Sequence, residues 1–107
     1  MAYKVLGQLA AAATTEEALY AVPASSSTVV SSIVIANRGS TTATYRLAVK
    51  PTAATTLATN HYIAYDVPLA ANDSVALTLG ITLGASYALR TYASVANLTF
   101  TAFGSES

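Results

Sequence analysis

His61, the only histidine of the chain, is the first residue to consider as a catalytic group. A hydrolytic triad needs a base beside a nucleophile and an acid that orients the base, and Asp66 or Asp73 could supply that acid. Serine and threonine are so frequent here that a nearby hydroxyl identifies no nucleophile, and the chain contains no Gly-x-Ser-x-Gly turn. The sequence therefore predicts that His61 lies at the edge of a strand and that the protein is not an enzyme.

The acidic residues do not form a recognisable site either. Glu16 and Glu17 are neighbours, and neighbours in an extended chain point to opposite faces, so they are expected to be solvated loop charges rather than a pair flanking one bond. Asp66 and Asp73 lack the Asp-x-Asp-x-Asp-Gly pattern of a calcium loop. The absence of cysteine, with one histidine, argues against zinc. We expect no catalytic, cofactor-binding or metal-binding residue and no cofactor.

Tyrosine supplies most of the aromatic side chains and has three possible uses. Tyr62 and Tyr92 fall out of phase with the apolar residues of their expected strands, which predicts that they point outward. Outward aromatic side chains are enriched at protein contacts, because they bury area while the hydroxyl keeps a partner. They would equally suit a platform on which a sugar stacks, or a second core. The full set is Tyr3, Tyr20, Tyr45, Tyr62, Tyr65, Tyr87 and Tyr92.

The charge content is low for a free protein. Charged residues make up 9% of the chain, the formal net charge is zero, and the five basic residues are scattered and matched by five acids. A nucleic-acid-binding protein normally carries a basic patch, so no nucleic-acid partner is expected. With so few charges, outward positions must be filled by Ser, Thr and Ala. Such a surface is typical of a protein packed into an assembly.

The chain has no segment that suggests a membrane or secretion. No run of about 18 apolar residues is present, so no membrane partner is expected. Gly7 and Gln8 interrupt the apolar residues near the N-terminus, which argues against a signal peptide. A domain without cysteine fits a protein made in a reducing cytoplasm, or one stabilised by association with its own copies or a partner.

Segment 28–50 is the element around which the others are expected to assemble. Over 44–50, large apolar residues alternate with Thr, Arg, Ala and Lys, which predicts a half-buried strand. Over 33–36 the run is wholly apolar, which predicts a strand covered on both faces or central in its sheet. A buried helix over 29–36 is disfavoured by the β-branched residues. We expect a hairpin with its reversal at Asn37-Arg38-Gly39, where Asn and Gly tolerate positive φ.

Further strands are expected on either side of this pair. In the segment 61–67, His61, Ile63, Tyr65 and Val67 are predicted to share the apolar face, opposite Tyr62, Ala64 and Asp66. We interpret 10–17 as a linker or one short turn, 51–60 as a crossover between sheets or a contact loop, and 104–107 as a loose tail. The remaining strands are expected at 3–9, 19–22, 74–79, 87–92 and 97–103. About eight short strands at this spacing predict one all-β domain, 1–107, an antiparallel β-sandwich of jelly-roll or immunoglobulin-like type.

Three stretches carry a resemblance to a known family. They are MAYKVLGQ at the N-terminus, LYAVPA from Leu19 and VSSIVIANRG from Val30. Together they resemble small virion structural proteins of tailed bacteriophages, those of cyanobacterial and marine phages in particular. These motifs are structural, so the resemblance assigns no binding residue to a position in this chain.

The resemblance implies a β-sandwich displayed on a virus particle. The expected function is that of a capsid decoration (cement) protein, made in the host cytoplasm and bound to the capsid surface. Its expected partners are the major capsid protein and its own copies, as a dimer or trimer. Residues 1–7 and 104–107 and the loop 51–60 are the expected contact elements. A tail or fibre module, or a carbohydrate-binding adhesion module, is the alternative.

Overall fold

The computed structural model describes residues 3–51 and 59–107, and β-strands account for most of them. The strands are β1 (Tyr3–Ala10), β2 (Glu17–Ala21), β3 (Thr28–Asn37), β4 (Ala43–Lys50), β5 (Tyr62–Leu69), β6 (Ser74–Leu83), β7 (Ala88–Ala93) and β8 (Leu98–Glu106). One short 3-10 helix, η1 (Thr59–His61), precedes β5. The predicted all-β class and the number of strands are confirmed.

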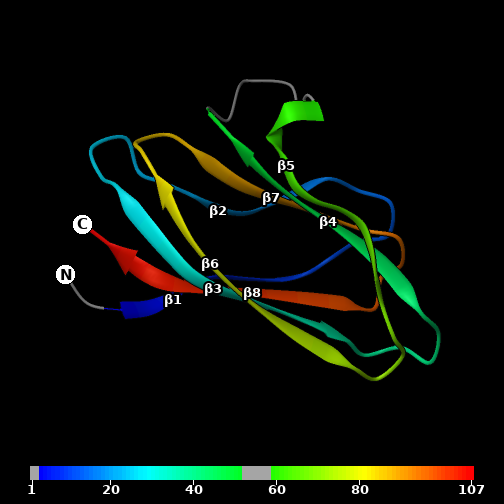
Figure 1. Cartoon of the computed structure of the whole chain (residues 1–107). Coiled ribbons are helices and arrows are strands. Elements are labelled where there is room, and N and C mark those ends of the chain that lie inside the picture. The colour runs from blue at the N-terminus through cyan, green and yellow to red at the C-terminus, as the bar shows by residue number, and fades with distance from the viewer. Residues whose placement is uncertain (1–2, 52–58) are drawn as a thin grey trace.

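The strands form two four-stranded antiparallel sheets that pack face to face (Figure 1). The first sheet has the order β1-β8-β3-β6, and the second has the order β2-β7-β4-β5. Strands near the two ends of the chain therefore pair with one another, as do the strands next inward: β1 with β8, β2 with β7, β3 with β6 and β4 with β5. This nested pairing of eight strands in two sheets is the jelly-roll arrangement, so the sandwich is of that type.

The expected hairpin over 28–50 is wrong, although both of its strands exist. β3 lies in the first sheet between β8 and β6, whereas β4 lies in the second sheet between β7 and β5. The connection crosses between sheets because the buried Asn37 side chain fixes it. Asn37 Nδ2 donates to the carbonyl oxygens of Thr41 at 2.9 Å and Leu69 at 3.1 Å, and Oδ1 accepts the Gly39 N–H at 2.9 Å. Neither Asn37 nor Gly39 has a positive φ.

Two other expectations for loops are also corrected. β4 and β5 are neighbours in the same sheet, so the connection between them is not a crossover; most of it, 52–58, lies outside the described residues. The C-terminal segment is not loose, because β8 runs to Glu106 between β1 and β3. A Cβ at Gly104 would lie 2.0 Å from the Val29 carbonyl oxygen, so the absence of a side chain is what allows this close packing. The N-terminal contact segment likewise lies in β1 from Tyr3 onward.

The core lies between the two sheets and follows the alternation expected from the sequence. Leu47 and Tyr45 of β4 point inward as predicted, and the Tyr45 ring meets Phe100 of β8 edge to face, with 6.5 Å between centroids. Ile33 and Ile35 of β3 are fully buried opposite them. Each such side chain contributes about 1.5–3 kcal/mol relative to an exposed position. Burial also raises the pKa of the Tyr45 hydroxyl above 10.0.

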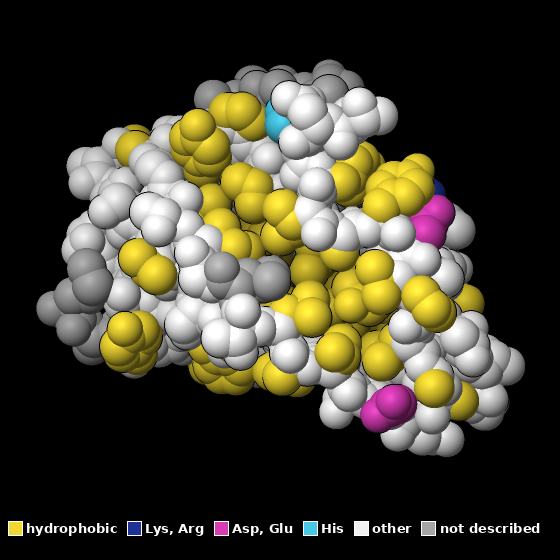
Figure 2. Space-filling model, in the orientation of Figure 1, with side chains coloured by type: hydrophobic (Ala, Val, Ile, Leu, Met, Phe, Trp, Pro, Cys, Tyr) yellow, Lys and Arg dark blue, Asp and Glu magenta, His cyan; other side chains and the backbone are white. Residues whose placement is uncertain are grey.

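The sandwich is closed on one side and open on the other. β1 and β2 are in contact, whereas apolar side chains between β5 and β6 remain visible from outside as a shallow, hollowed strip (Figure 2). Val67 of β5 and Val75, Leu77 and Ile81 of β6 pack against the core but stay half-buried. This strip is apolar and open, and the described part of the chain contains no enclosed pocket.

Candidate functional site

The outer face of the second sheet carries a cluster of aromatic and charged side chains, here called the Arg46 cluster: Arg46, Tyr62, Tyr65, Asp66 and Tyr92. The Arg46 guanidinium lies 4.2 Å from the centre of the Tyr65 ring and 4.3 Å from the centre of the Tyr92 ring. Arg46 Nε donates to Asp66 Oδ1 at 2.7 Å, and Arg46 Nη2 donates to Asp66 Oδ2 at 3.3 Å. A guanidinium between two rings, with a bidentate carboxylate, is held in one place.

A bulge in β5 builds this cluster. Tyr45 pairs with Val67 and Leu47 pairs with Ala64, so two residues of β5 stand opposite the single residue Arg46. Those two residues are Tyr65 and Asp66, and both contact Arg46. Asp66 takes the left-handed conformation, with φ of 50°, that lets the strand accommodate the extra residue.

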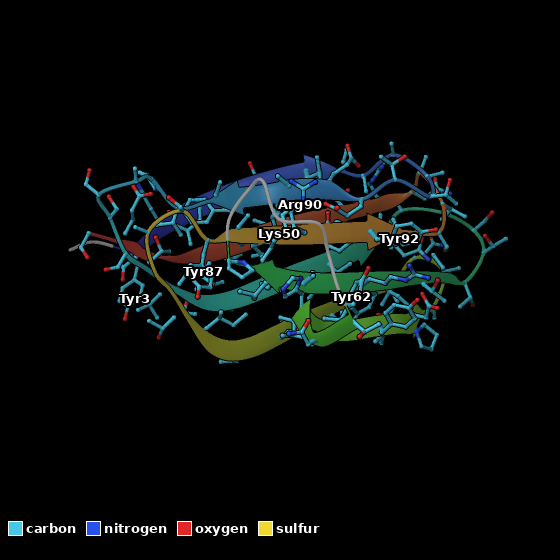
Figure 3. The ribbon with its side chains drawn as sticks, turned by 90° about the horizontal axis from the view of Figure 1, so that it is seen from above. Tyr3, Lys50, Tyr62, Tyr87, Arg90 and Tyr92 are labelled. Carbon is cyan, nitrogen blue, oxygen red and sulfur yellow. The ribbon has the colours of Figure 1, made fainter. Side chains whose placement is uncertain are left out.

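The tyrosine predictions are confirmed in part. Tyr92 pairs with Arg46 and Tyr62 with Ala48, so both lie on the outer face as expected; Figure 3 shows both on the second sheet. Tyr65 was expected on the apolar face, and that is wrong: it is 56% exposed, and its ring meets Tyr62 edge to face at 4.9 Å. Aspartate is a poor strand residue, and its place in the middle of β5 was the available signal for the bulge that reverses Tyr65.

The electrostatics of the cluster favour a structural role. The hydrogen bond that Arg46 donates to the Asp66 carboxylate raises the pKa of the guanidinium above its ordinary value, and desolvation opposes this shift. The guanidinium therefore stays charged at any ordinary pH and is unsuited to proton transfer. Through its contacts with the Tyr65 ring and the Asp66 carboxylate, Arg46 of β4 holds the bulged edge strand β5 in place. What the cluster still offers to a ligand is the exposed face of Tyr65 beside Tyr62.

A second polar group joins the two sheets at one end of the sandwich. The Tyr20 hydroxyl of β2 donates to the Glu106 carboxylate of β8 and lies 2.8 Å from the Thr28 hydroxyl of β3. Lys4 of β1 approaches Glu106 at 3.3 Å. Burial, then the hydrogen bond to Glu106, raises the pKa of Tyr20. The Tyr20 hydrogen bond, then Lys4, lowers the pKa of Glu106 below 4.5. This group fastens the C-terminal strand.

Both candidate acids of the triad, Asp66 and Asp73, have other hydrogen-bond partners in the structure. His61 lies in η1, half-buried, at the start of β5. Asp66 is engaged by Arg46, and Asp73 accepts the backbone N–H of Ser74 at 2.8 Å in the turn before β6. The described residues contain no group of three or more histidine, cysteine, aspartate or glutamate side chains placed to hold a metal ion.

Of the two adjacent glutamates, Glu16 lies in the loop before β2 and is exposed, as expected, whereas Glu17 begins β2 and is half-buried. Glu16 forms an ion pair with Arg90 on the outer face of the second sheet. Glu17 Oε1 accepts the backbone N–H of Ala12 at 2.8 Å and so fixes the connection between β1 and β2. Both carboxylates therefore have partners within the chain.

The outer face of the first sheet has a different character. The strand registers place uncharged side chains on it, and Val34 of β3 lies beside Thr101 of β8 and Ala76 of β6 near its centre. One charge borders it, because the exposed Arg38 donates from Nε to Thr99 Oγ1 at 2.8 Å. Phe103 of β8 lies beside Val5 of β1 toward one end. Apart from the amide of Gln8, the side chains on this face are small, hydroxylated or apolar: Tyr3, Val5, Gln8, Ala10, Val29, Ser32, Val34, Ala36, Ser74, Ala76, Thr78, Thr82, Thr99, Thr101, Phe103 and Ser105. We call this surface the neutral face.

Comparisons of the chain with protein-family models, with curated proteins and with solved structures found no match to any of them. Among the described residues, the structure contains no helix with the length and apolar character that a membrane span requires.

Proposed function

We propose that the protein is a non-enzymatic structural component of a tailed-phage particle, a decoration protein that binds the capsid surface in many copies. Its partners would be the major capsid protein and its own copies. Jelly rolls occur in viral capsid proteins and also in lectins and cupins, so the fold supports this proposal without selecting it. The character of the outer face of the first sheet is what favours the decoration role.

The neutral face is the observation that carries the proposal. Covering a charged side chain costs several kcal/mol unless it is paired, and the centres of protein interfaces are accordingly poor in charge. The centre of the neutral face, around Val34 and Thr101, can be covered by a partner without desolvating a charge, since Arg38 borders the face at Thr99. Most of the charged groups elsewhere already have partners within the fold, as in Arg46–Asp66 and Arg90–Glu16.

Repetition supplies the stabilisation in this proposal. One copy that contributes an interface of about 800 Å² per partner binds with moderate strength. Many copies on a symmetric lattice add their contributions and clamp neighbouring capsid subunits. No moving part or reactive group is needed for this role, which agrees with a sandwich whose side chains are fixed by one another.

The experiment that tests the proposal is reconstitution. Particles of the encoding phage, prepared without this protein, are mixed with the purified chain and pelleted through a cushion. We expect the chain to pellet with capsids, to saturate at a fixed ratio to the capsid subunit, and to raise the temperature at which capsids open. A chain that stays in the supernatant, or that pellets with isolated tails alone, would overturn the proposal.

The exposed Tyr65 supports a second candidate, a carbohydrate-binding adhesion module. Its ring, beside that of Tyr62, presents an apolar surface on which a sugar ring can stack. A glycan array probed with wild type, Tyr65→Ala and Tyr87→Ala tests this candidate. Tyr87 is also exposed but lies before β7, away from Tyr62 (Figure 3), so it is the matched control. Binding that is lost only in Tyr65→Ala supports the candidate, and no binding by wild type removes it.

A further inference from the structure

β6 is the edge strand that the sequence leaves unprotected. Strands β1, β6, β2 and β5 form the four edges of the two sheets. β1 carries Lys4, β2 carries Glu17, and β5 carries Asp66 and Pro68. β6 contains no charged residue and no proline. Proteins normally protect an exposed edge with charge, proline, a bulge or a short strand, because unpaired backbone groups recruit another strand.

The regular part of β6 is long enough to accept a partner strand. Ser74–Thr78 pairs residue by residue with Ala36–Ser32 of β3, and the register shifts only beyond Thr78. The shift coincides with Gly80, whose φ is 61°, so the irregularity falls on one end of β6. Alternate residues of Ser74–Thr78 direct their backbone N–H and C=O groups away from β3, and within the described residues β3 is the only strand neighbour of β6.

The side chains of β6 are also incompletely covered. Val75 and Leu77 point toward the core, opposite Ile35 and Ile33 of β3, yet both remain half-buried. They belong to β6, which borders the open apolar strip seen in Figure 2. A strand added beside β6 would cover these apolar side chains and pair the free backbone groups in one step.

We infer that β6 pairs in antiparallel fashion with β6 of a second copy of this chain, around a two-fold axis near Ala76. A two-fold contact places the same surface on both sides, so the surface must be complementary to itself. Ser74–Thr78 meets that condition, because it is uncharged and its outward side chains are small. Val75 of one copy then lies opposite Leu77 of the other, and the two pairs extend the apolar core across the axis.

Two acidic residues lie near this contact. Asp73, directly before β6, accepts the Ser74 N–H at 2.8 Å within its own copy and lies outside the central segment Ser74–Thr78. Asp66 on the adjacent edge strand β5 is already paired with Arg46 within its own copy. The pairing also joins two first sheets into one sheet of eight strands, with the neutral faces of both copies side by side. The inference deepens the proposed function, since it names the surface through which copies associate, and it rests on that part of the proposal.

Sedimentation velocity over a concentration series tests the inference on the intact chain. The variants are Ala76→Lys, which places like charges at the two-fold axis, and Gln8→Lys, which adds the same charge on the same outer face at the opposite edge. Like charges directly opposite each other on paired strands are destabilising. We expect wild type and Gln8→Lys to form dimers, and Ala76→Lys to weaken dimerisation by at least about tenfold. Circular dichroism verifies that all three are folded.

Hydrogen exchange gives an independent measurement without substitution. Amide protection over Ser74–Thr78 should rise with protein concentration in wild type, while protection over β1 should not. A wild type that remains monomeric, an Ala76→Lys variant that still forms dimers, or concentration-dependent protection confined to another strand would each overturn the inference.

The experiments can disprove the decoration role and the β6 contact independently of each other. A monomeric chain that still pellets with capsids removes the β6 contact and leaves the decoration role. A dimer that does not bind particles removes the decoration role and leaves the β6 contact. Capsids that bind only the monomer and protect β6 amides would show that the capsid protein, not a second copy, supplies the added strand.

Discussion

The outer faces of the two sheets are built from strands of the same pattern but carry opposite kinds of side chain. On the second sheet, Arg46, Tyr65 and Tyr92 interlock around an ion pair. On the first sheet, Val34 and Thr101 lie at the centre of a surface whose only neighbouring charge among the described contacts is Arg38, bonded to Thr99. The second sheet has a bulged edge strand, β5, that needs a clamp. The first sheet also has register shifts at its edge strands β1 and β6, yet its described residues form no comparable cluster of arginine and aromatic side chains.

This difference indicates which outer face is better suited to contact a partner. The polar groups of the second face are largely committed to one another, so that face stabilises the domain. The neutral face makes little use of its side chains within the domain, so it can be covered by a partner at little cost. The proposed division is therefore one face for internal stability and one for association.

The largest effect is expected from placing a charge on the neutral face. Thr101→Glu puts a carboxylate at the centre of that face, where burial by the capsid would leave it unpaired, at a cost of several kcal/mol. Binding to capsids should fall by more than about a hundredfold, because each 1.4 kcal/mol is tenfold. Thr44→Glu, at a half-buried position on the second sheet, is the matched control and should bind as wild type does. Equal losses in the two variants would break the comparison.

A smaller effect is expected from removing the centre of the Arg46 cluster. Arg46→Ala loses two ring contacts, each about 0.5–1 kcal/mol, and one ion pair of about 0–1 kcal/mol after solvent screening. The free energy of unfolding should fall by about 2 kcal/mol in urea titration, with capsid binding of the folded protein unchanged. Arg90→Ala, which loses the Glu16 ion pair, should cost less than about 1 kcal/mol. A cost for Arg90→Ala equal to that of Arg46→Ala would show that the rings contribute nothing.

The smallest effect concerns the end where the two sheets are joined. The pKa of Glu106 is lowered in the folded state, so its contacts stabilise the fold above its ordinary value of 4.5. That contribution is lost as the pH falls below 4.5 through the lower folded pKa. The melting temperature of Glu106→Gln should therefore lie slightly below that of wild type at pH 7. The difference in melting temperature should disappear at acid pH. A difference that stays constant with pH would contradict a stabilising role for the Glu106 carboxylate.

The positions of the strands were predictable because alternation is a local property. The side chains of Tyr45 and Leu47 point inward as their spacing indicated, and the apolar run of β3 marks a central strand as expected. The choice of strand partners was not predictable in the same way. β3 and β4 are adjacent in sequence, yet each pairs with strands far along the chain, because nested pairing closes two sheets instead of one.

The candidate site was predictable only in part, for a related reason. Tyr62 and Tyr92 were assigned to the outer face from their phase. Tyr65 joined them because the pairing of β5 with β4 shifts its register twice, on either side of Leu47, and such bulges are invisible to a period-two pattern. The anchoring of the C-terminal segment was missed for the opposite reason: Gly104 offers no side chain to read, and its backbone is what packs against Val29.

The most direct test of the account is the orientation of the chain on the particle. Electron cryomicroscopy of decorated capsids, at a resolution that separates strands, should show density on the capsid surface with the β1-β8-β3-β6 sheet turned toward the shell. Density confined to the tail, or a chain whose Arg46 cluster faces the shell, would contradict the account.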